Sequence, residues 1–189
     1  MVIAPSLNNQ RALSPVVQDL KHKDYTYCTS LKQIIPYARV YWHSVLWLPS
    51  FLRLYFSSPE DERVMIRPNY PYFVSAPGML KVADNFYRRN KGNLQMVVFA
   101  NDHTSPLICM IQAAYNVGIK TLYTQHASVT DMFPPLLFTY SFLDGKDSLE
   151  KYEKCGEISG SVFLSGSARF DDIQNMEKAY TGAIGVAFN

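Results

Sequence analysis

Short apolar segments alternate with polar turns and longer amphipathic segments along most of this chain. Apolar, β-prone runs at Val2–Ala4, Met96–Ala100 and Thr121–Thr124 each end in polar residues. Further strands are expected at Tyr25–Cys28, Phe138–Leu143, Ser161–Leu164 and Ala183–Phe188. Strands that alternate with helical segments are typical of parallel sheets. The pattern therefore predicts an α/β fold that is Rossmann-like, with a mainly parallel sheet and flanking helices.

Start and stop signals place helices between these strands. Ser105-Pro106 opens a helix that Gly118 closes, because Pro is favoured at the first helical position and Gly in a left-handed turn. Another helix is expected to end near Leu20, with Ser14-Pro15 either opening or kinking it. Three more are expected at Met79–Arg89, Ser148–Lys154 and Asp171–Tyr180. Four prolines instead predict an irregular loop after Ser58, with a short strand near Val64–Ile66. These prolines are Pro59, Pro68, Pro71 and Pro77.

The segment Leu31–Ser58 is unusually aromatic and apolar. Its apolar residues recur at helical spacing, with Pro36 and Pro49 as kinks or boundaries. One interpretation is a pair of helices that pack in the core. The other is a peripheral membrane contact or a surface for a lipid-linked acceptor, since Trp, Tyr and Phe near arginines are typical of such interfaces. The sequence leaves both open.

Composition narrows the class of protein. A hydrophobic fraction of 48% with 18% charged residues is typical of a globular chain, and 189 residues fit one large domain. A net charge of +2 without a basic block argues against a nucleic-acid partner. Three cysteines without a CxxC pair favour a reducing compartment. With no secretory signal and no long apolar run, the expected location is cytoplasmic or the inner face of the cytoplasmic membrane.

Small polar residues gather at the carboxyl ends of the expected strands. In parallel strands these ends share one edge of the sheet, and in open α/β sheets ligands bind at that edge. We therefore expect the following residues to bind substrate through hydroxyl, amide or backbone groups: Ser6, Asn8, Asn9, Asn101, Thr104, Gln125, Ser128, Gly166 and Ser167.

Two histidines at this edge are candidates for acid–base chemistry. His126 and His103 could each act as a general base on an acceptor hydroxyl, and Asp102 could orient either ring and stabilise its protonated form. His22 and His43 are interpreted as structural. The sequence lacks the GxSxG elbow of serine hydrolases, the GxGxxG fingerprint of dinucleotide-binding proteins and a cluster of metal ligands. No cofactor or metal is expected.

The segment from Val97 to Asp171 resembles the later part of the N-terminal domain of GT-B-type enzymes. These include bacterial surface-carbohydrate glycosyltransferases, teichoic-acid glycerophosphate polymerases and non-hydrolysing UDP-N-acetylglucosamine 2-epimerases. The similar elements are Asn101-Asp102-His103-Thr104, Ala114–Ile119, Thr124-Gln125-His126-Ala127, Leu143-Asp144-Gly145 and Gly166–Asp171. The opening residues 4–12 also look like the first strand and loop of a sugar transferase.

The resemblance implies transfer of a sugar from a nucleotide-sugar donor to a hydroxyl of a carbohydrate or lipid-linked acceptor, in surface polysaccharide or lipopolysaccharide biosynthesis. In the polymerases and related transferases, a His at the position of His126 acts as base. The chain departs from the pattern at Ala127, where Gly is usual, and at Gln125, where the epimerases carry an acid. A sugar-nucleotide epimerase half and a non-catalytic membrane- or partner-binding module are the alternatives.

The resembled fold places most of its donor site in a C-terminal domain. We therefore expect residues 1–182 to form the N-terminal, Rossmann-like domain and residues 183–189 to begin the first strand of a second, missing or truncated domain. On this interpretation, the isolated chain has little or no transferase turnover.

Overall fold

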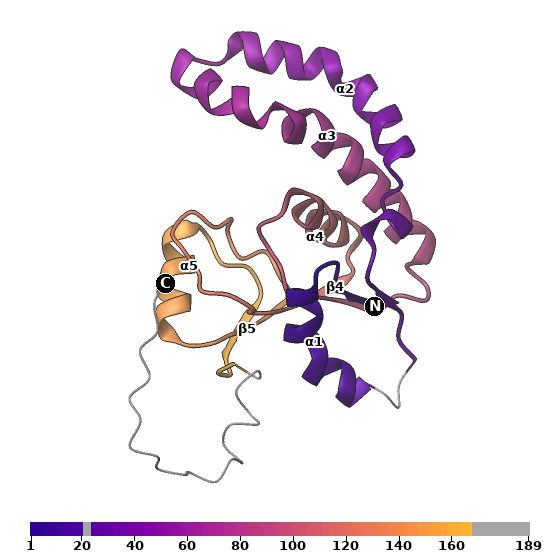
Figure 1. The fold of residues 1–189 in the computed structure, drawn as a ribbon, viewed down its shortest axis with the longest axis vertical. Coiled ribbons are helices and arrows are strands. Elements are labelled where there is room, and N and C mark those ends of the chain that lie inside the picture. Colours follow the sequence, from indigo (N-terminus) through magenta and orange to yellow (C-terminus); the bar gives the residue numbers. More distant parts are fainter. Residues whose placement is uncertain (21–23, 168–189) are drawn as a thin grey trace.

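The computed structural model describes residues 1–20 and 24–167, which build a six-stranded sheet between helices (Figure 1). Every neighbouring pair of strands is parallel, in the order β2-β1-β3-β4-β5-β6. The strands are β1 Val2–Ile3, β2 Tyr27–Cys28, β3 Met96–Phe99, β4 Lys120–Thr124, β5 Tyr140–Leu143 and β6 Ser161–Leu164. The predicted α/β class and parallel sheet are confirmed.

Helices cover both faces of this sheet, which explains why its central strand is almost continuously apolar. On β3, Val97 and Phe99 belong to the large core cluster, whereas Val98 belongs to a smaller cluster on the other side. Helix α1 (Leu7–Asp19) supplies Ala12 and Leu13 to the smaller cluster. The large cluster lies under the helices on the opposite face. Because all the strands are parallel, their carboxyl ends share one edge of the sheet.

The β3–α4–β4 unit forms as the sequence predicts. Helix α4 (Ser105–Val117) has Pro106 in its first turn and ends at Gly118, whose φ is 74°. Only glycine adopts this left-handed conformation at little cost. The ammonium of Lys91 donates to the carbonyl of Val117 at 2.7 Å and caps the last turn. Helix α5 (Lys146–Cys155) then follows β5, one or two residues longer at each end than expected.

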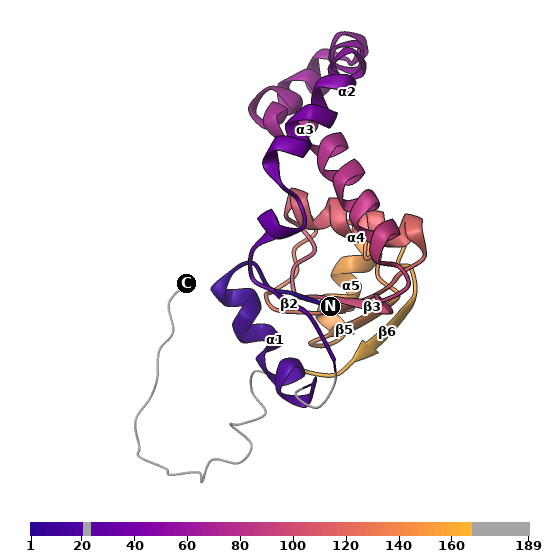
Figure 2. The ribbon, with the colours of Figure 1, turned by 90° about the vertical axis from the view of Figure 1, so that its right-hand side faces the viewer.

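A long helical hairpin stands away from the sheet on the α4 side (Figures 1 and 2). A short 3₁₀ turn, Leu31–Gln33, leads into α2 (Tyr37–Ser57), and α3 (Glu60–Asn90) returns to the sheet. The predicted loop and short strand over residues 59–78 are therefore wrong. Pro68 and Pro71 lie inside α3 but on an exposed stretch, where carbonyls that lose a helical partner face solvent.

The two helices of the hairpin cross where α3 has no side chain. A Cβ atom at Gly78 would come within 2.3 Å of both the Val40 carbonyl oxygen and Ser44 Oγ. Val40 and Ser44 are the buried residues of α2, and most of its large apolar side chains are exposed. The interpretation of this segment as core-packing helices is therefore wrong for α2. Pro36 does mark its start, whereas Pro49 lies within it.

Some predicted features lie outside the described residues. These are the helix at 171–180, the strand at 183–188, the domain boundary near 183, residues 168–171 of the Gly166–Asp171 motif, and His22, interpreted as structural. Within residues 1–20 and 24–167, every helix is too short or too polar to cross a membrane.

Candidate functional site

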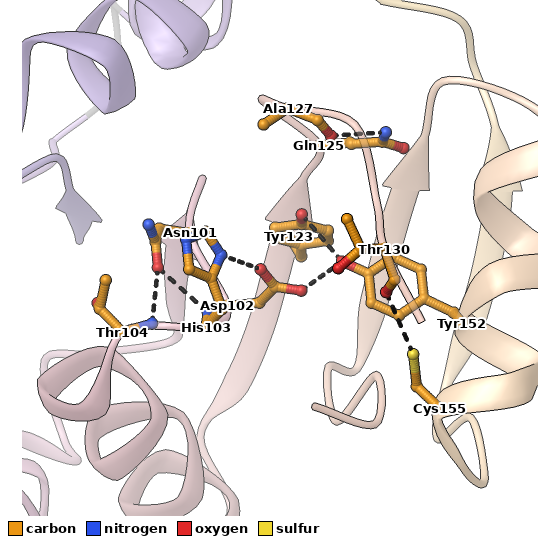
Figure 3. Close-up of polar contacts among 10 residues, drawn as sticks. All are labelled: Asn101, Asp102, His103, Thr104, Tyr123, Gln125, Ala127, Thr130, Tyr152 and Cys155. Atoms are coloured by element: carbon orange, nitrogen blue, oxygen red, sulfur yellow. Dashed lines mark hydrogen bonds and ion pairs between the residues drawn. The ribbon is translucent and has the colours of Figure 1, made fainter. Parts of the chain in front are cut away.

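The turn after β3 is shaped by a buried asparagine. Asn101 Oδ1 accepts hydrogen bonds from the backbone N–H groups of His103 and Thr104, both at 3.2 Å (Figure 3). An Asn side chain that bonds the backbone in this way mimics a turn and prepares the start of a helix. Asn101 therefore builds the site, and its bonded oxygen is directed at the protein backbone.

Asp102 lies at the centre of the polar contacts, and its side chain is only 4% exposed. Its Oδ1 is 3.2 Å from Nδ1 of His103, and its Oδ2 accepts a hydrogen bond from the hydroxyl of Tyr152 on α5 (Figure 3). A carboxylate can only accept hydrogen bonds, so the ring nitrogen that faces it carries the proton. In neutral His103 this leaves the Nε2 lone pair to take a proton from a ligand.

Two buried tyrosines complete this network. The hydroxyl of Tyr123 on β4 is 3.1 Å from that of Tyr152. Because Tyr152 gives its single proton to Asp102, the Tyr123 hydroxyl is the donor between the two. Burial raises the pKa of both phenols, and the nearby Asp102 carboxylate raises them further. Both therefore remain protonated donors, and they connect the turn after β3 with β4 and α5.

The two candidate histidines lie side by side, although 23 positions separate them in the sequence. The rings of His103 and His126 are nearly parallel, with 9° between their planes and 6.0 Å between centroids. Phe133 lies against His103 at a centroid distance of 4.8 Å. The strand-end rule therefore predicted this proximity correctly. Figure 3 shows the contact of the His103 ring with Asp102.

Gln125 connects two strand ends. Its Oε1 accepts from the Asp144 backbone N–H at 2.9 Å. Its Nε2 donates to the Ala127 carbonyl at 2.9 Å, as Figure 3 shows. Both polar ends of this buried side chain are thus used within the protein. Ser128, two residues beyond His126, is exposed at the same edge.

The loop after β1 lies on the other side of β3. Ser6 Oγ accepts from the Asn9 backbone N–H at 3.1 Å and caps α1, and its hydroxyl contacts the Asn9 side chain. Asn9 is buried and Asn8 is exposed. Of the predicted binding residues in this loop, Ser6 and Asn8 are thus the exposed ones, and the Ser6 hydroxyl is engaged in capping α1.

The turn after β6 is the most distant part of the predicted site. β5 lies between β4 and β6, so Gly166 and Ser167 begin roughly 10 Å from the end of β4, two strand spacings away. Gly166 is exposed, with a φ of 73°. The structure thus brings Asn101–Thr104 and Gln125–Ser128 together, with the β1 and β6 loops on the two flanks.

Sequence reasoning missed Tyr123, Tyr152 and Phe133. A signal was present for Tyr152, which lies in the middle of an amphipathic helix, because a buried Tyr hydroxyl usually finds a hydrogen-bond partner. Within the described ranges, the structure contains no cluster of three or more His, Cys, Asp or Glu side chains placed to hold a metal. A hollow of about 980 Å³ lies at the opposite edge, by the amino ends of β1, β3 and β4. The hollow contains none of the polar network described above. The carboxyl edge is a candidate site because of that network of Asp102, His103 and Tyr152.

Comparison with known proteins assigns no family to the chain. The sequence matches no protein-family model, and the curated proteins contain no significant match to it.

Proposed function

We propose that this chain is the acceptor-side part of a GT-B-type glycosyltransferase that moves a sugar from a nucleotide-sugar to a hydroxyl acceptor. The observation that carries the proposal is the buried Asp102 carboxylate, which contacts His103 on one oxygen and the Tyr152 hydroxyl on the other. Buried carboxylates that orient a histidine are a recurrent device for general base catalysis. The all-parallel sheet supports the proposal by placing this group at the edge where α/β proteins bind ligands.

In this mechanism His103 is the base. Nε2 of His103 takes the proton of the acceptor hydroxyl as its oxygen attacks the anomeric carbon. The bond between that carbon and the donor phosphate breaks, and the nucleotide leaves with the electron pair. Asp102 holds the His103 tautomer and stabilises the imidazolium that forms. Tyr152 and Tyr123 act through Asp102 and are positioning residues.

His126 is the second candidate for the base. It is the residue that the resemblance to the polymerases implies for this role. Its ring lies 6.0 Å from that of His103, so both can reach one acceptor, and a variant of each separates their roles. The proposed base is the one whose replacement removes the chemical step and leaves donor binding in place.

The test is release of free nucleotide from a panel of nucleotide-sugars, with candidate acceptors present, by the protein with any C-terminal domain that follows. We expect His103→Gln to lower the turnover at least about 100-fold, which is the usual loss of rate when a general base is removed. His43→Gln is the matched control, because His43 is on α2 and far along the chain from the polar edge. Wild-type turnover by His103→Gln would refute the assignment of His103 as the base. Loss of turnover in His126→Gln alone would assign the base to His126.

A further inference from the structure

The outer side of α2 is a continuous apolar surface. At about 100° per residue, Tyr41, Val45, Leu52 and Phe56 fall within roughly 60° of helix circumference, with Trp42 and Leu46 beside them. These six residues form what we call the α2 face. Trp42 is 70% exposed, Leu46 66% and Phe56 72%. Single exposed apolar residues are ordinary, but a contiguous surface of this kind marks an interaction site.

The charged residues of α2 itself are all of one sign. Helix α2 contains no Asp or Glu, and its two arginines, Arg39 and Arg53, are exposed. Helical spacing places Arg53 between Trp42 and Leu46 and Arg39 at the adjoining border of the face, where a long side chain can bury its stem and keep the guanidinium in water. The face therefore complements a surface that is apolar at depth and anionic at its boundary.

Three of the four acidic residues of the hairpin are at its tip, and the fourth, Asp84, is paired with Arg88. Glu60, Asp61 and Glu62 form the first turn of α3. Glu60 is paired with Arg63 at 3.2 Å and with Arg67 at 2.9 Å. An anionic surface would repel this tip, so the charge distribution favours a contact along the side of α2.

The arrangement of the hairpin permits such a contact. In both views α2 is the helix farthest from the sheet, with α3 between α2 and α4 (Figures 1 and 2). Its 21 residues extend about 30 Å. A partner groove usually receives a narrow stripe of positions i, i+3, i+4 and i+7 on a helix. The α2 face is wider than that stripe and combines Trp, Tyr and Phe with arginines, as helices in the membrane interface do.

We propose that the α2 face docks this protein on an anionic lipid bilayer, with α2 lying in the plane of the interface. The apolar side chains of the face enter the boundary between headgroups and acyl chains, and Arg39 and Arg53 contact lipid phosphates. The proposal is independent of the glycosyltransferase proposal, because none of its residues belongs to the strand-end site.

The protein supplies its own probe for this contact. The chain contains two tryptophans, Trp42 and Trp47, and both lie on α2 and are at least half exposed. Addition of phosphatidylcholine vesicles that contain phosphatidylglycerol should shift their emission to shorter wavelength, and the protein should co-sediment with these vesicles. Pure phosphatidylcholine vesicles should bind it more weakly, and high salt should reduce the difference.

A matched pair of leucines tests the α2 face. We expect Leu46→Glu to weaken vesicle binding at least about tenfold, since a leucine that would enter the bilayer is replaced by a charge that the anionic lipids repel. Leu7→Glu makes the same substitution at a residue that is 70% exposed on α1, and it should bind as the wild type does. Arg39→Gln and Arg53→Gln should each weaken binding roughly fivefold on anionic vesicles and have little effect on neutral ones.

Three results would overturn the proposal. The first is wild-type binding by Leu46→Glu, and the second is an equal loss in Leu7→Glu. The third is a dimer that Leu46→Glu converts to monomer while neither protein binds vesicles, which would make the α2 face an interface between copies of the chain. Nucleotide release without vesicles should be the same in Leu46→Glu and wild type, so this test and the His103 test can fail separately.

Discussion

At the scale of single residues, the Asp102 carboxylate shows how a buried charge is retained at a candidate site. An unpaired buried carboxylate would be strongly unfavourable, but each oxygen of Asp102 has a partner, His103 or Tyr152. The Tyr152 hydroxyl is itself bonded to Tyr123. The network therefore contributes to stability and holds the imidazole in one orientation.

Removal of the Tyr152 hydroxyl tests the stability contribution. We expect Tyr152→Phe to lower the free energy of unfolding by about 1–3 kcal/mol, because a buried carboxylate loses a hydrogen-bond donor. Urea unfolding followed by circular dichroism measures the change. Tyr115→Phe, at a tyrosine that is 68% exposed, should stay within about 0.5 kcal/mol of wild type. Equal stabilities of the two variants would contradict the role given to Tyr152.

The three cysteines should differ in reactivity. Burial raises the pKa of Cys28 and raises that of Cys109 from 9.0 to about 11. Thiolates are the reactive form, so at pH 8 a thiol reagent should modify one cysteine rapidly, the partly exposed Cys155. Cys155→Ser should abolish this fast reaction and leave slow labelling of the two buried thiols. Rapid labelling that persists in this variant would show that Cys28 or Cys109 is accessible.

The raised pKa of Cys109 also has a consequence for stability. Between pH 9 and about 11 the folded chain keeps the proton that the unfolded chain loses. The folded state thus binds more protons in this window, and the contribution of Cys109 to stability falls as the pH rises through it. Cys109→Ala should reduce the slope of unfolding free energy against pH in this range. An unchanged slope would contradict the assignment.

At the scale of elements, the hairpin depends on close contact between α2 and α3 at Gly78. We expect Gly78→Ala to destabilise the protein by about 1–3 kcal/mol, because the new methyl group overlaps the Val40 carbonyl. The usual gain of about 0.5–1 kcal/mol from replacing a helical glycine by alanine is too small to reverse this. Thermal unfolding measures the effect.

Gly92 provides the control for this substitution. A Cβ atom there has no described atom within 4 Å, so Gly92→Ala should leave the melting temperature near that of wild type or raise it slightly. A Gly78→Ala protein as stable as Gly92→Ala would mean that the two helices do not meet as closely as described.

Local patterns predicted the sheet and most helices because each signal acts within a few residues. Alternating composition marked the strands, and Ser105-Pro106 with Gly118 marked both ends of α4. Pro68, Pro71 and Pro77 misled the prediction of α3. At Pro68 and Pro71 the helix is exposed, so solvent can replace the hydrogen bonds that these prolines remove. The periodicity of α2 identified a helix but could not say that the apolar side chains lack a partner within the described chain.

For the candidate site, the sequence predicted which residues lie close together but not which of them contact one another. The strand-end rule brought His103 and His126 together, since it depends only on parallel pairing of β3 and β4. The choice of partner for Asp102 depends on side-chain rotamers, and the contact with Tyr152 depends on how α5 docks on the sheet. Neither is encoded in a local pattern.

At the scale of the whole molecule, the described chain divides into a well-buried sheet and a weakly buried hairpin. Residues 45–65 contribute just Ser58 to the buried set, whereas three of the four residues of β3 are buried. Segments with few buried apolar contacts open at a lower free energy than the core does. The hairpin should therefore open without unfolding of the sheet.

Native-state hydrogen exchange measures this difference. We expect peptides from residues 45–72 to exchange faster than peptides from β3 and β4, by an opening that urea affects little. Anionic vesicles should slow exchange on α2 if the bilayer proposal is correct. Equal protection of the outer hairpin and β3 would contradict the division of the molecule into two levels of stability.

The position of β1 in the sheet has a consequence for synthesis on the ribosome. β1 pairs with β3, and the whole hairpin lies between them in the sequence. At a synthesis rate of about 5–20 residues per second, roughly 5–20 s pass between the synthesis of β1 and that of β3. The contacts between α2 and α3 all lie within residues 37–90, so the hairpin can form during that interval. The α2 face is then exposed on the nascent chain before the sheet has closed, so a bilayer or a chaperone can bind the protein before its candidate catalytic edge exists.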